Sequence, residues 1–306
     1  MKREIKKGIA IAGGGANGDF TAGKLHQRKD TSYVMGHGIS TGALMLIAAL
    51  TGTWGVFLAY VETSNKMIFN KAPFTKKGFP RIPFWIVRIV KSITIKRVNS
   101  IGESKPLRKL VDQYYNEDIY SKLKDQGKVA MVGAYSITKQ EIHNAKSNYH
   151  DWAEFKNFII ASASAPLIMS IETFGRTKVS QPEEWTDGGI VDNFNAAILF
   201  ENGCTEVDLF LHKSKSQVKQ KGVTKNIVHN IIRTFMSIFK GNSEADLLAG
   251  IRAAEHHKGI LRVHYMPEHL AKRNPFYFSV GQMTNGFNEG IQMAYDKSLI
   301  ETYNYA

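Results

Sequence analysis

GIAIAGGGANGDFTAG, residues 8–23, places three consecutive glycines directly after a short apolar run. The run, residues 8–12, is typical of a buried strand, and residues 19–27 are expected to form a short helix. A glycine-rich loop between a strand and a helix presents backbone N–H groups that can stabilise the negative oxygen of a tetrahedral intermediate. We therefore predict an oxyanion hole in this loop. The glycines assigned to it are Gly13, Gly14, Gly15 and Gly18.

The next informative stretch is GISTG, residues 38–42, which has the form G-x-S-x-G. It lies between an expected strand, residues 32–36, and an apolar run that is typical of a helix. This context is that of a nucleophile elbow, a sharp strand-to-helix turn that exposes the serine hydroxyl. We predict that Ser40 is the nucleophile, and that Gly38 and Gly42 let the strand and the helix approach closely. The alternative role for Ser40 is that of a helix N-cap.

A third motif, DGG at residues 187–189, supplies the candidate base. Asp-Gly alone is a common turn signal. However, no histidine of the chain stands in a triad-like motif, and His37 on the incoming strand is expected to point away from the nucleophile. Asp187 is therefore the leading candidate for taking the proton of Ser40 directly, and Asp192 is the second candidate.

The glycine-rich loop also fits G-x-G-x-x-G, the fingerprint of a dinucleotide-binding site. That fingerprint expects an acidic residue at the end of the next strand, where this chain instead has His37 and Ser40. A dinucleotide-dependent enzyme is therefore a weaker interpretation. The early place of Ser40 leaves room for only two short strands before it, which argues against the ordinary α/β-hydrolase topology.

Strand-like and helix-like segments alternate along the 306 residues, with no internal repeat and no low-complexity linker. This alternation predicts a single domain, residues 1–306, built as an α/β sandwich around a mostly parallel sheet. Further strands are expected at residues 128–136, 206–212 and 261–265. Further helices are expected at residues 152–161, 226–239, 244–257 and 281–295.

Residues 39–61 include no charged side chain, and this stretch is long enough to span a bilayer. It is interrupted by Gly52 and Gly55, which disfavour one continuous helix. Two buried helices, residues 41–50 and 54–64, are therefore expected in place of a transmembrane segment.

Together these motifs resemble the patatin-like phospholipase family. Its pattern has a strand followed by G-G-G-x-R-G, then G-x-S-x-G, and well downstream D-G-G or D-G-A. The resemblance extends to ASASAP at residues 161–166 and DGGIVDN at residues 187–193, and it covers at least residues 8–212. One position departs from the pattern, since Asn17 stands where the family usually has arginine. This departure puts the activity of the loop in question.

The resemblance implies a three-layer α/β/α sandwich and a lipid acyl hydrolase of the phospholipase A type, which cleaves fatty acyl esters of glycerophospholipids. It implies a Ser40–Asp187 dyad that works through an acyl-enzyme and needs no metal and no cofactor. Two alternatives with the same fold stay open. One is an acyltransferase or transacylase that uses the same serine, and the other is a catalytically impaired module that binds membrane or protein.

The chain carries 40 Lys and Arg against 27 Asp and Glu, and its net charge of +13 favours anionic partners such as a membrane surface or nucleic acid. The excess is concentrated in residues 63–102, which contain nine basic and no acidic residues, interleaved with Phe and Trp. We call this segment the basic insertion and predict a flap or a membrane-contacting helix in it. The alternative is a solvated insertion packed on the domain. The residues assigned to the membrane contact are Trp85, Arg88, Lys91, Lys96 and Arg97.

The expected partners are a phospholipid or other acyl-lipid substrate and an anionic membrane surface, and nucleic acid is not expected. A protein activator would be needed if the site is normally closed. The single cysteine, Cys204, excludes an internal disulfide framework and fits a reducing compartment. We therefore expect a cytoplasmic protein that associates peripherally with membranes.

Overall fold

The computed structural model describes residues 4–69, 73–77, 81–94, 100–219 and 243–306. Within these residues the strands form one sheet in the order β5-β6-β3-β2-β1-β7-β8-β9, and β4 also pairs with β3. The strands are β1 (Lys7–Ile11), β2 (Tyr33–Ile39), β3 (Val129–Ser136), β4 (Glu141–Lys146), β5 (Glu172–Phe174), β6 (Glu183–Asp187), β7 (Glu206–Phe210), β8 (Ile260–His264) and β9 (Ile300–Asn304).

The middle of the sheet is parallel. β1 pairs in parallel with β2 and β7, β2 with β3, and β7 with β8. Antiparallel strands complete the sheet on both sides, since β4 and β6 pair with β3, β5 with β6, and β9 with β8. The predicted mostly parallel sheet is thus confirmed, and the antiparallel strands were not predicted.

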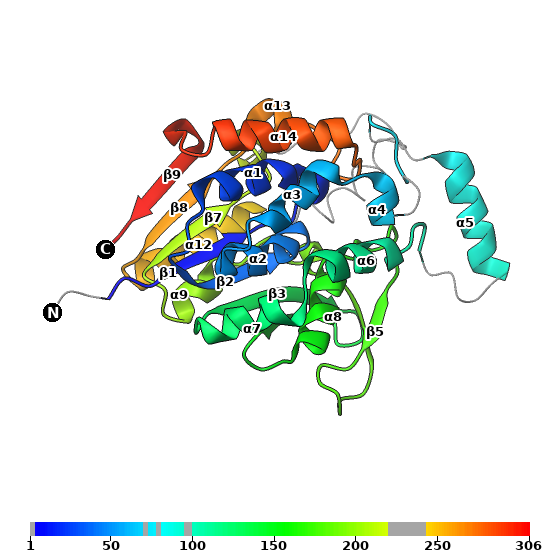
Figure 1. Ribbon diagram of the computed structural model, residues 1–306, viewed down its shortest axis with the longest axis horizontal. Coiled ribbons are helices and arrows are strands. Elements are labelled where there is room, and N and C mark those ends of the chain that lie inside the picture. The colour runs from blue at the N-terminus through cyan, green and yellow to red at the C-terminus, as the bar shows by residue number, and fades with distance from the viewer. Residues whose placement is uncertain (1–3, 70–72, 78–80, 95–99, 220–242) are drawn as a thin grey trace.

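Helices cover both faces of the sheet (Figure 1). They are α1 (Gly18–Arg28), α2 (Thr41–Thr51), α3 (Gly55–Glu62), α4 (Asn65–Phe69), α5 (Ile82–Thr94), α6 (Lys105–Tyr114), α7 (Glu117–Asp125), α8 (Trp152–Ser162), α9 (Ala197–Glu201), α10 (Lys215–Lys219), α12 (Ser243–His256), α13 (Glu268–Ala271) and α14 (Val280–Gln292). Short 3₁₀ turns are η1 (Gly15–Asn17), η2 (Gly188–Ile190) and η3 (Lys297–Leu299).

Strand β1 shows why two helical layers are needed. Its side chains alternate between the two faces of the sheet. Ile9 and Ile11 lie in a core that contains residues of α1, α2, α8 and α14, whereas Ala10 and Ala12 lie in a second core with residues of α9 and α12. Because both faces are apolar, both must be covered, and the result is the expected three-layer α/β/α sandwich.

The uncharged stretch at residues 39–61 forms two helices, as predicted. Helix α2 ends at Thr51, and Gly52 follows in the left-handed conformation (φ 71°) that commonly ends a helix. Helix α3 then begins at Gly55. Among the helices that the structure describes, none is long and apolar enough to cross a membrane.

The other predicted elements that fall in described residues are present, with ends displaced by at most three residues. The largest displacement at a strand is in β2, which continues to Ile39 through Gly36 and Gly38. Glycines lack the side chains that indicate a strand in sequence, so the predicted strand ended too early. The helix predicted at residues 226–239 lies outside the described residues. In Figure 1, α5 lies at one end of the molecule and both chain termini at the other.

Candidate active site

Ser40 stands at the sharp turn between β2 and α2. Its backbone has φ 55° and ψ −124°, a strained conformation for a residue with a side chain. A Cβ atom at position 42 would lie 2.1 Å from the carbonyl oxygen of Ile11, and one at position 38 would lie 2.6 Å from the carbonyl oxygen of Gly42. The backbones therefore approach so closely that only glycine fits at both positions. This geometry is that of the predicted nucleophile elbow.

A short chain of hydrogen bonds holds the strained turn. The backbone N–H of Ser40 donates to Ser162 Oγ at 2.9 Å, and Ser162 Oγ donates to the carbonyl oxygen of Gly133 at 2.6 Å. Ser162 is the last residue of α8 and belongs to the ASASAP segment. That segment therefore supports the elbow directly.

Sheet register brings Asp187 to the same edge as Ser40. Gly133 of β3 pairs with Ile39, the residue before Ser40, and Ala134 of β3 pairs with Asp187 at the end of β6. The N–H of Asp187 donates to the carbonyl oxygen of Ser164 at 3.0 Å. Ser40 and Asp187 are 147 residues apart in sequence, and they lie close together because β2 and β6 both flank β3.

The carboxyl group of Asp187 is buried, with 2% of the residue exposed. Burial raises the pKa of Asp187 to about 7, although hydrogen bonds from the Ser40 side chain and from the Gly189 N–H act in the opposite direction. The Gly189 N–H lies 2.8 Å from Asp187 Oδ1. A carboxylate with a pKa near neutrality is a far better base for a serine hydroxyl than an ordinary surface aspartate.

The candidate bases differ in where they lie relative to Ser40. Asp187 lines the pocket at Ser40, whereas Asp192 is not among the described residues that line it. His37 is fully buried, and its Nε2 is 2.8 Å from Asn144 Oδ1, so it is engaged away from Ser40 as expected. Of the candidate bases, Asp187 is therefore the one that lies at Ser40.

Four backbone N–H groups of the glycine-rich loop already donate to carbonyl oxygens. They belong to Gly13, Ala16, Asn17 and Gly18. Within the described residues, the N–H groups of Gly14 and Gly15 have no such partner. Both glycines line the pocket beside Ser40. The candidate oxyanion donors thus narrow to Gly14 and Gly15.

Gly13 and Gly18 have structural roles in this loop. The Gly13 N–H donates to the carbonyl oxygen of Asn193 at 3.0 Å. A Cβ atom at position 18 would lie 2.8 Å from Thr41 Oγ1, so Gly18 lets α1 pack against the start of α2. Neither of these two glycines offers a free N–H to a substrate oxygen.

A C-terminal segment braces the loop from outside. The carbonyl oxygen of Pro275 accepts the Ala16 N–H at 2.8 Å. Gly15 has φ 54°, and a Cβ atom there would lie 2.2 Å from the same Pro275 oxygen. The loop conformation is therefore fixed by a segment about 260 residues away, which sequence alone does not indicate.

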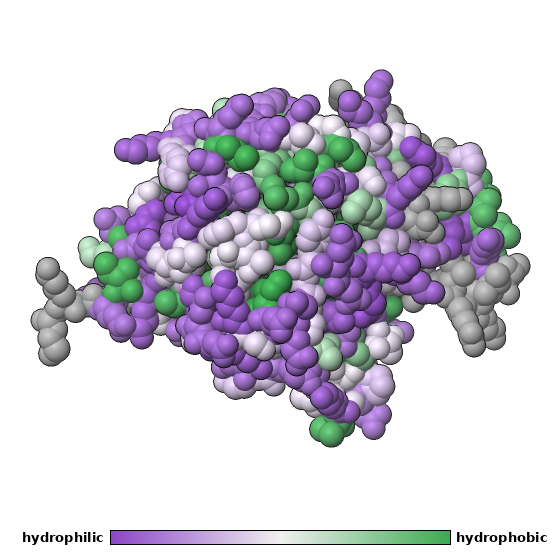
Figure 2. All heavy atoms as spheres, viewed as in Figure 1, coloured by the Kyte–Doolittle hydropathy of each residue, from purple (hydrophilic) through white to green (hydrophobic). Residues whose placement is uncertain are grey.

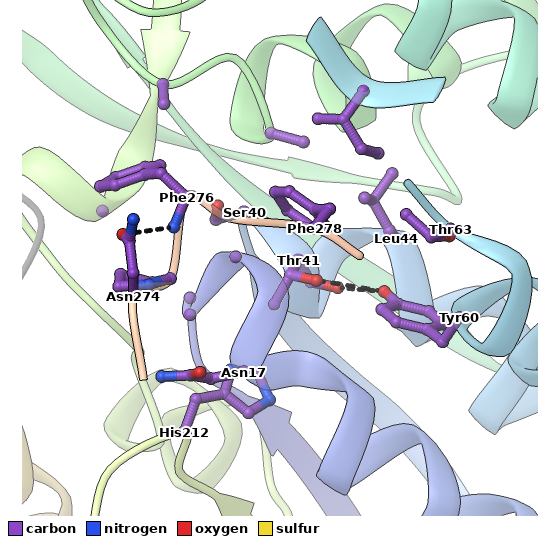
Figure 3. Close-up of a pocket in the computed structure, with 18 of the residues that line it drawn as sticks. Asn17, Ser40, Thr41, Leu44, Tyr60, Thr63, His212, Asn274, Phe276 and Phe278 are labelled. Atoms are coloured by element: carbon purple, nitrogen blue, oxygen red, sulfur yellow. Dashed lines mark hydrogen bonds between the residues drawn. The ribbon is translucent and has the colours of Figure 1, made fainter. Parts of the chain in front are cut away.

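Ser40 and Asp187 open into a cavity of about 900 Å³ (Figure 3). One part of its wall is apolar and comes from α2, α3, α4 and α6 together with a later segment. The apolar and aromatic residues there are Leu44, Val56, Ala59, Tyr60, Ile68, Phe69, Leu107, Leu110, Val111, Tyr114 and Phe278. A cavity of this size and lining can take an acyl chain.

Two buried polar side chains of the cavity are His212, which was not predicted as a site residue, and Asn17, which was noted only as a departure from the family pattern. His212 is 3% exposed and Asn17 is 5% exposed, and Figure 3 shows them together at one side of the pocket. Both ring nitrogens of His212 and Oδ1 of Asn17 lack a hydrogen-bond partner within the described residues. Burial lowers the pKa of His212 to about 4, so its ring is neutral at physiological pH. The one signal in sequence was its place just after β7, at the carboxyl edge of the parallel strands.

In the part of the chain that the structure describes, no group of three or more His, Cys, Asp or Glu side chains is placed to hold a metal ion.

Helix α5 of the basic insertion turns two of its predicted membrane-contact residues toward the protein. Trp85 Nε1 donates to the carbonyl oxygen of Pro73 at 2.9 Å, and Arg88 donates to the carbonyl oxygen of Gly102 at 3.0 Å. Lys91 is exposed, whereas Lys96 and Arg97 lie outside the described residues.

The exposed side of α5 is apolar. Ile86, Val87 and Val90 are 54%, 53% and 53% exposed. Figure 2 shows hydrophobic atoms at the edge of the molecule where α5 lies. The membrane-facing candidates on this helix are therefore its aliphatic residues, and Trp85 and Arg88 attach the helix to the domain.

Comparison with known proteins gives three findings. A family model described as patatin-like phospholipase matches residues 9–200. Among solved structures, VipD from Legionella pneumophila matches with a TM-score of 0.37 and 12% sequence identity, over 99% of this chain and 68% of that one. A search of the curated proteins found no match.

Proposed function

The chain belongs to the patatin-like phospholipase family, a family of lipid acyl hydrolases, and from this premise we propose that it is a phospholipase A that uses Ser40 and Asp187. The observation that carries the proposal is the contact between the strained Ser40 and a buried carboxyl group whose pKa is about 7. A serine needs an adjacent base to become nucleophilic at neutral pH. Asp187 supplies that base without a histidine.

The first half of the reaction forms an acyl-enzyme. Ser40 Oγ attacks the ester carbonyl carbon while its proton passes to Asp187. The N–H groups of Gly14 and Gly15 stabilise the resulting oxyanion. When the intermediate collapses, the bond to the lysophospholipid oxygen breaks, and Asp187 returns the proton to that oxygen.

The second half releases the fatty acid. Water attacks the acyl-enzyme carbonyl and gives its proton to Asp187, the same N–H groups stabilise the second oxyanion, and the proton returns to Ser40 as the ester bond breaks. The apolar wall between α3, α4 and α6 holds the acyl chain during both halves. Its burial there positions the carbonyl carbon at Ser40.

Access to lipid is assigned to α5. Its exposed aliphatic residues Ile86, Val87 and Val90 stand on the same helix as the exposed Lys91. Such a surface binds at the boundary between head groups and acyl chains of an anionic membrane. The enzyme then works as a peripheral membrane protein.

The test is labelling with a fluorophosphonate probe, which reacts only with an activated serine. We expect labelling of the wild type, none of Ser40→Ala, and strongly reduced labelling of Asp187→Asn. Ser121→Ala, an exposed serine on α7, is the matched control and should label normally. Labelling that persists in Ser40→Ala, or that is lost equally in Ser121→Ala, would contradict the assignment. Release of fatty acid from glycerophospholipids by the wild type completes the test.

A further inference from the structure

The cavity at Ser40 has two unlike ends. Beyond its apolar wall it is lined by five cationic side chains, and among the lining residues that the structure describes Asp187 is the one carboxylate. The five cations are Lys76, Lys77, Lys213, Lys272 and Arg273. A lining with five cations and one carboxylate is unusual for a site whose substrate is a neutral ester, and it favours a negatively charged part of the substrate.

Hydrogen bonds from two side-chain amides to backbone carbonyl oxygens bring together the three parts of the chain that carry these cations. Asn274 Nδ2 donates to the carbonyl oxygen of Thr75 at 3.0 Å, which joins the segment before Lys76 to the segment after Arg273. Gln217 Nε2 donates to the carbonyl oxygen of Ala271 at 2.8 Å, which joins the segment of Lys213 to that of Lys272. The cationic residues therefore lie together at one end of the cavity.

The cations of this end are neutralised to different degrees. Arg273 forms a bidentate pair with the buried Asp19, and Lys272 lies 3.4 Å from Glu268. Lys76 and Lys77 are exposed, and no carboxylate of the described residues forms an ion pair with them. Lys76 and Lys77 are thus the side chains whose charge is most available to a ligand.

Two neutral side chains complete this end of the cavity. The ring nitrogens of His212 and Oδ1 of Asn17 are buried and unpartnered within the described residues. A buried polar atom without a partner costs free energy, and a ligand in the pocket can supply the missing hydrogen bond. Figure 3 shows Asn17, His212 and Asn274 toward one side of the pocket, and Leu44, Tyr60 and Thr63 toward the other.

Ser40 lies where the two ends meet. On one side it faces the glycine-rich loop, where a Cβ atom at position 13 would lie 3.2 Å from Ser40 Cβ and one at position 14 would lie 2.3 Å from His212 Cβ, so this loop leads to the end that holds His212. On the other side the neighbouring Thr41 Oγ1 lies 3.1 Å from the hydroxyl of Tyr60 in the apolar wall. A substrate ester at Ser40 would therefore extend its acyl chain toward Tyr60 and its alcohol part toward the cations.

We propose that the cationic end binds the phosphate of an anionic phospholipid head group, so that the enzyme prefers lipids such as phosphatidylglycerol to zwitterionic ones. This inference rests on the proposed function. A phosphate binds to lysine through charge-assisted hydrogen bonds. The ammonium group of phosphatidylcholine would instead enter a region where Lys76 and Lys77 are exposed and where Asp19 is already paired with Arg273 and Glu268 with Lys272.

The test uses dihexanoyl phosphatidylglycerol and dihexanoyl phosphatidylcholine below the concentrations at which they form micelles. No lipid surface is then present, so a preference cannot come from membrane attraction. We expect kcat/KM of the wild type to be about tenfold higher for the phosphatidylglycerol, and we expect Lys76→Gln/Lys77→Gln to remove most of this preference. Lys76→Arg/Lys77→Arg should retain it, because the charge remains.

A matched control removes two lysines that do not line the cavity. Lys109→Gln/Lys122→Gln lowers the net charge equally, since both residues are exposed on α6 and α7, and it should keep the preference. Equal kcat/KM of the wild type for the two lipids, or an unchanged preference in Lys76→Gln/Lys77→Gln, would overturn the head-group inference.

Failure of the proposed function gives a different result. A wild type that cleaves neither lipid nor a neutral p-nitrophenyl ester would contradict the hydrolase assignment. Calorimetric titration of Ser40→Ala with the two lipids then still tests the cationic end. Tighter binding of the phosphatidylglycerol supports the inference, and equal binding overturns it.

Discussion

The nucleophile elbow and helix α5 differ in what fixes them. At the elbow, backbone atoms contact one another directly, since a Cβ atom at position 42 would lie only 2.1 Å from the Ile11 carbonyl oxygen. The Ser40 N–H also donates a hydrogen bond to Ser162 Oγ. Helix α5 is attached through side chains, namely Trp85 and Arg88, and leaves an aliphatic face exposed. The elbow is thus fixed by backbone contacts that leave no space for a larger residue, whereas α5 is held by side chains and keeps apolar residues exposed.

The largest expected effect is at the base. Asp187→Asn preserves shape but removes the proton acceptor, and we expect kcat for a soluble p-nitrophenyl ester to fall about a thousandfold. In the wild type the rate should rise with pH around an apparent pKa of about 7, since Asp187 acts when ionised. A wild-type rate that is flat from pH 5 to 9, or a variant with nearly full activity, would refute the role of Asp187.

Asp187→Asn should raise the stability of the protein at alkaline pH, although it lowers the activity. The pKa of Asp187 is raised in the folded protein, so the folded state binds its proton more tightly than the unfolded chain does. Its contribution to stability is therefore full below pH about 4 and is lost as the pH rises through about 7. Thermal unfolding should show Asp187→Asn to be more stable than the wild type at pH 8, with the gain shrinking toward pH 4.

The second effect tests the backbone packing of the elbow. Gly42→Ala would force a methyl group into the Ile11 carbonyl oxygen, and we expect the free energy of unfolding in urea to fall by about 3 kcal/mol. Gly281→Ala in α14 is the matched control, because a Cβ atom there meets nothing within 4 Å. That control should be neutral or up to about 1 kcal/mol more stable. A tolerated Gly42→Ala would mean that the elbow has room to relax.

The elbow was predictable because its motif is local: Gly38, Ser40 and Gly42 stand within five residues. The contacts that require this motif are not local, since Gly42 packs against Ile11 of β1 and the Ser40 N–H donates to Ser162. The position of the glycine-rich loop was predictable, but the identity of its free N–H groups was not. Which of its N–H groups stay free depends on Asn193 and Pro275, and these residues are brought to the loop only by the folded chain.

Other parts of the site were beyond sequence reasoning for the same reason. His212 carries no local motif, and its position beside Gly14 follows from the pairing of β1 with β7. For α5, the basic and aromatic composition of the basic insertion predicts a flap or a membrane-contacting helix, but it does not say which side of the helix meets the protein. That choice depends on Pro73 and Gly102, which accept the bonds from Trp85 and Arg88.

The third effect concerns the exposed face of α5. Ile86→Asn/Val87→Asn/Val90→Asn removes exposed apolar area without touching the bonds of Trp85 or Arg88. We expect the affinity for anionic vesicles in a sedimentation assay to fall about tenfold. Hydrolysis of a soluble ester by the same samples reports on the integrity of the site.

The control for this experiment removes exposed apolar side chains from two other helices. Leu248→Asn/Val280→Asn changes residues of α12 and α14 that are 47% and 51% exposed. Vesicle binding should stay at the wild-type level in this control. If both sets of substitutions weaken binding equally, the contact is with general surface hydrophobicity and α5 is not the docking helix.

The smallest expected effect is at Asn17, where the family pattern has arginine. Sequence alone leaves open an impaired enzyme, but the structure offers other supports for the loop. Pro275 accepts the Ala16 N–H at 2.8 Å, and Arg273, two residues earlier, pairs with Asp19 at the start of α1. Because the loop is held from this side, Asn17→Ala should change kcat for a soluble ester by less than about threefold. A loss of a hundredfold would place the Asn17 amide among the groups that act on the oxyanion, and the loop would then resemble the elbow, where one side chain or one glycine decides activity.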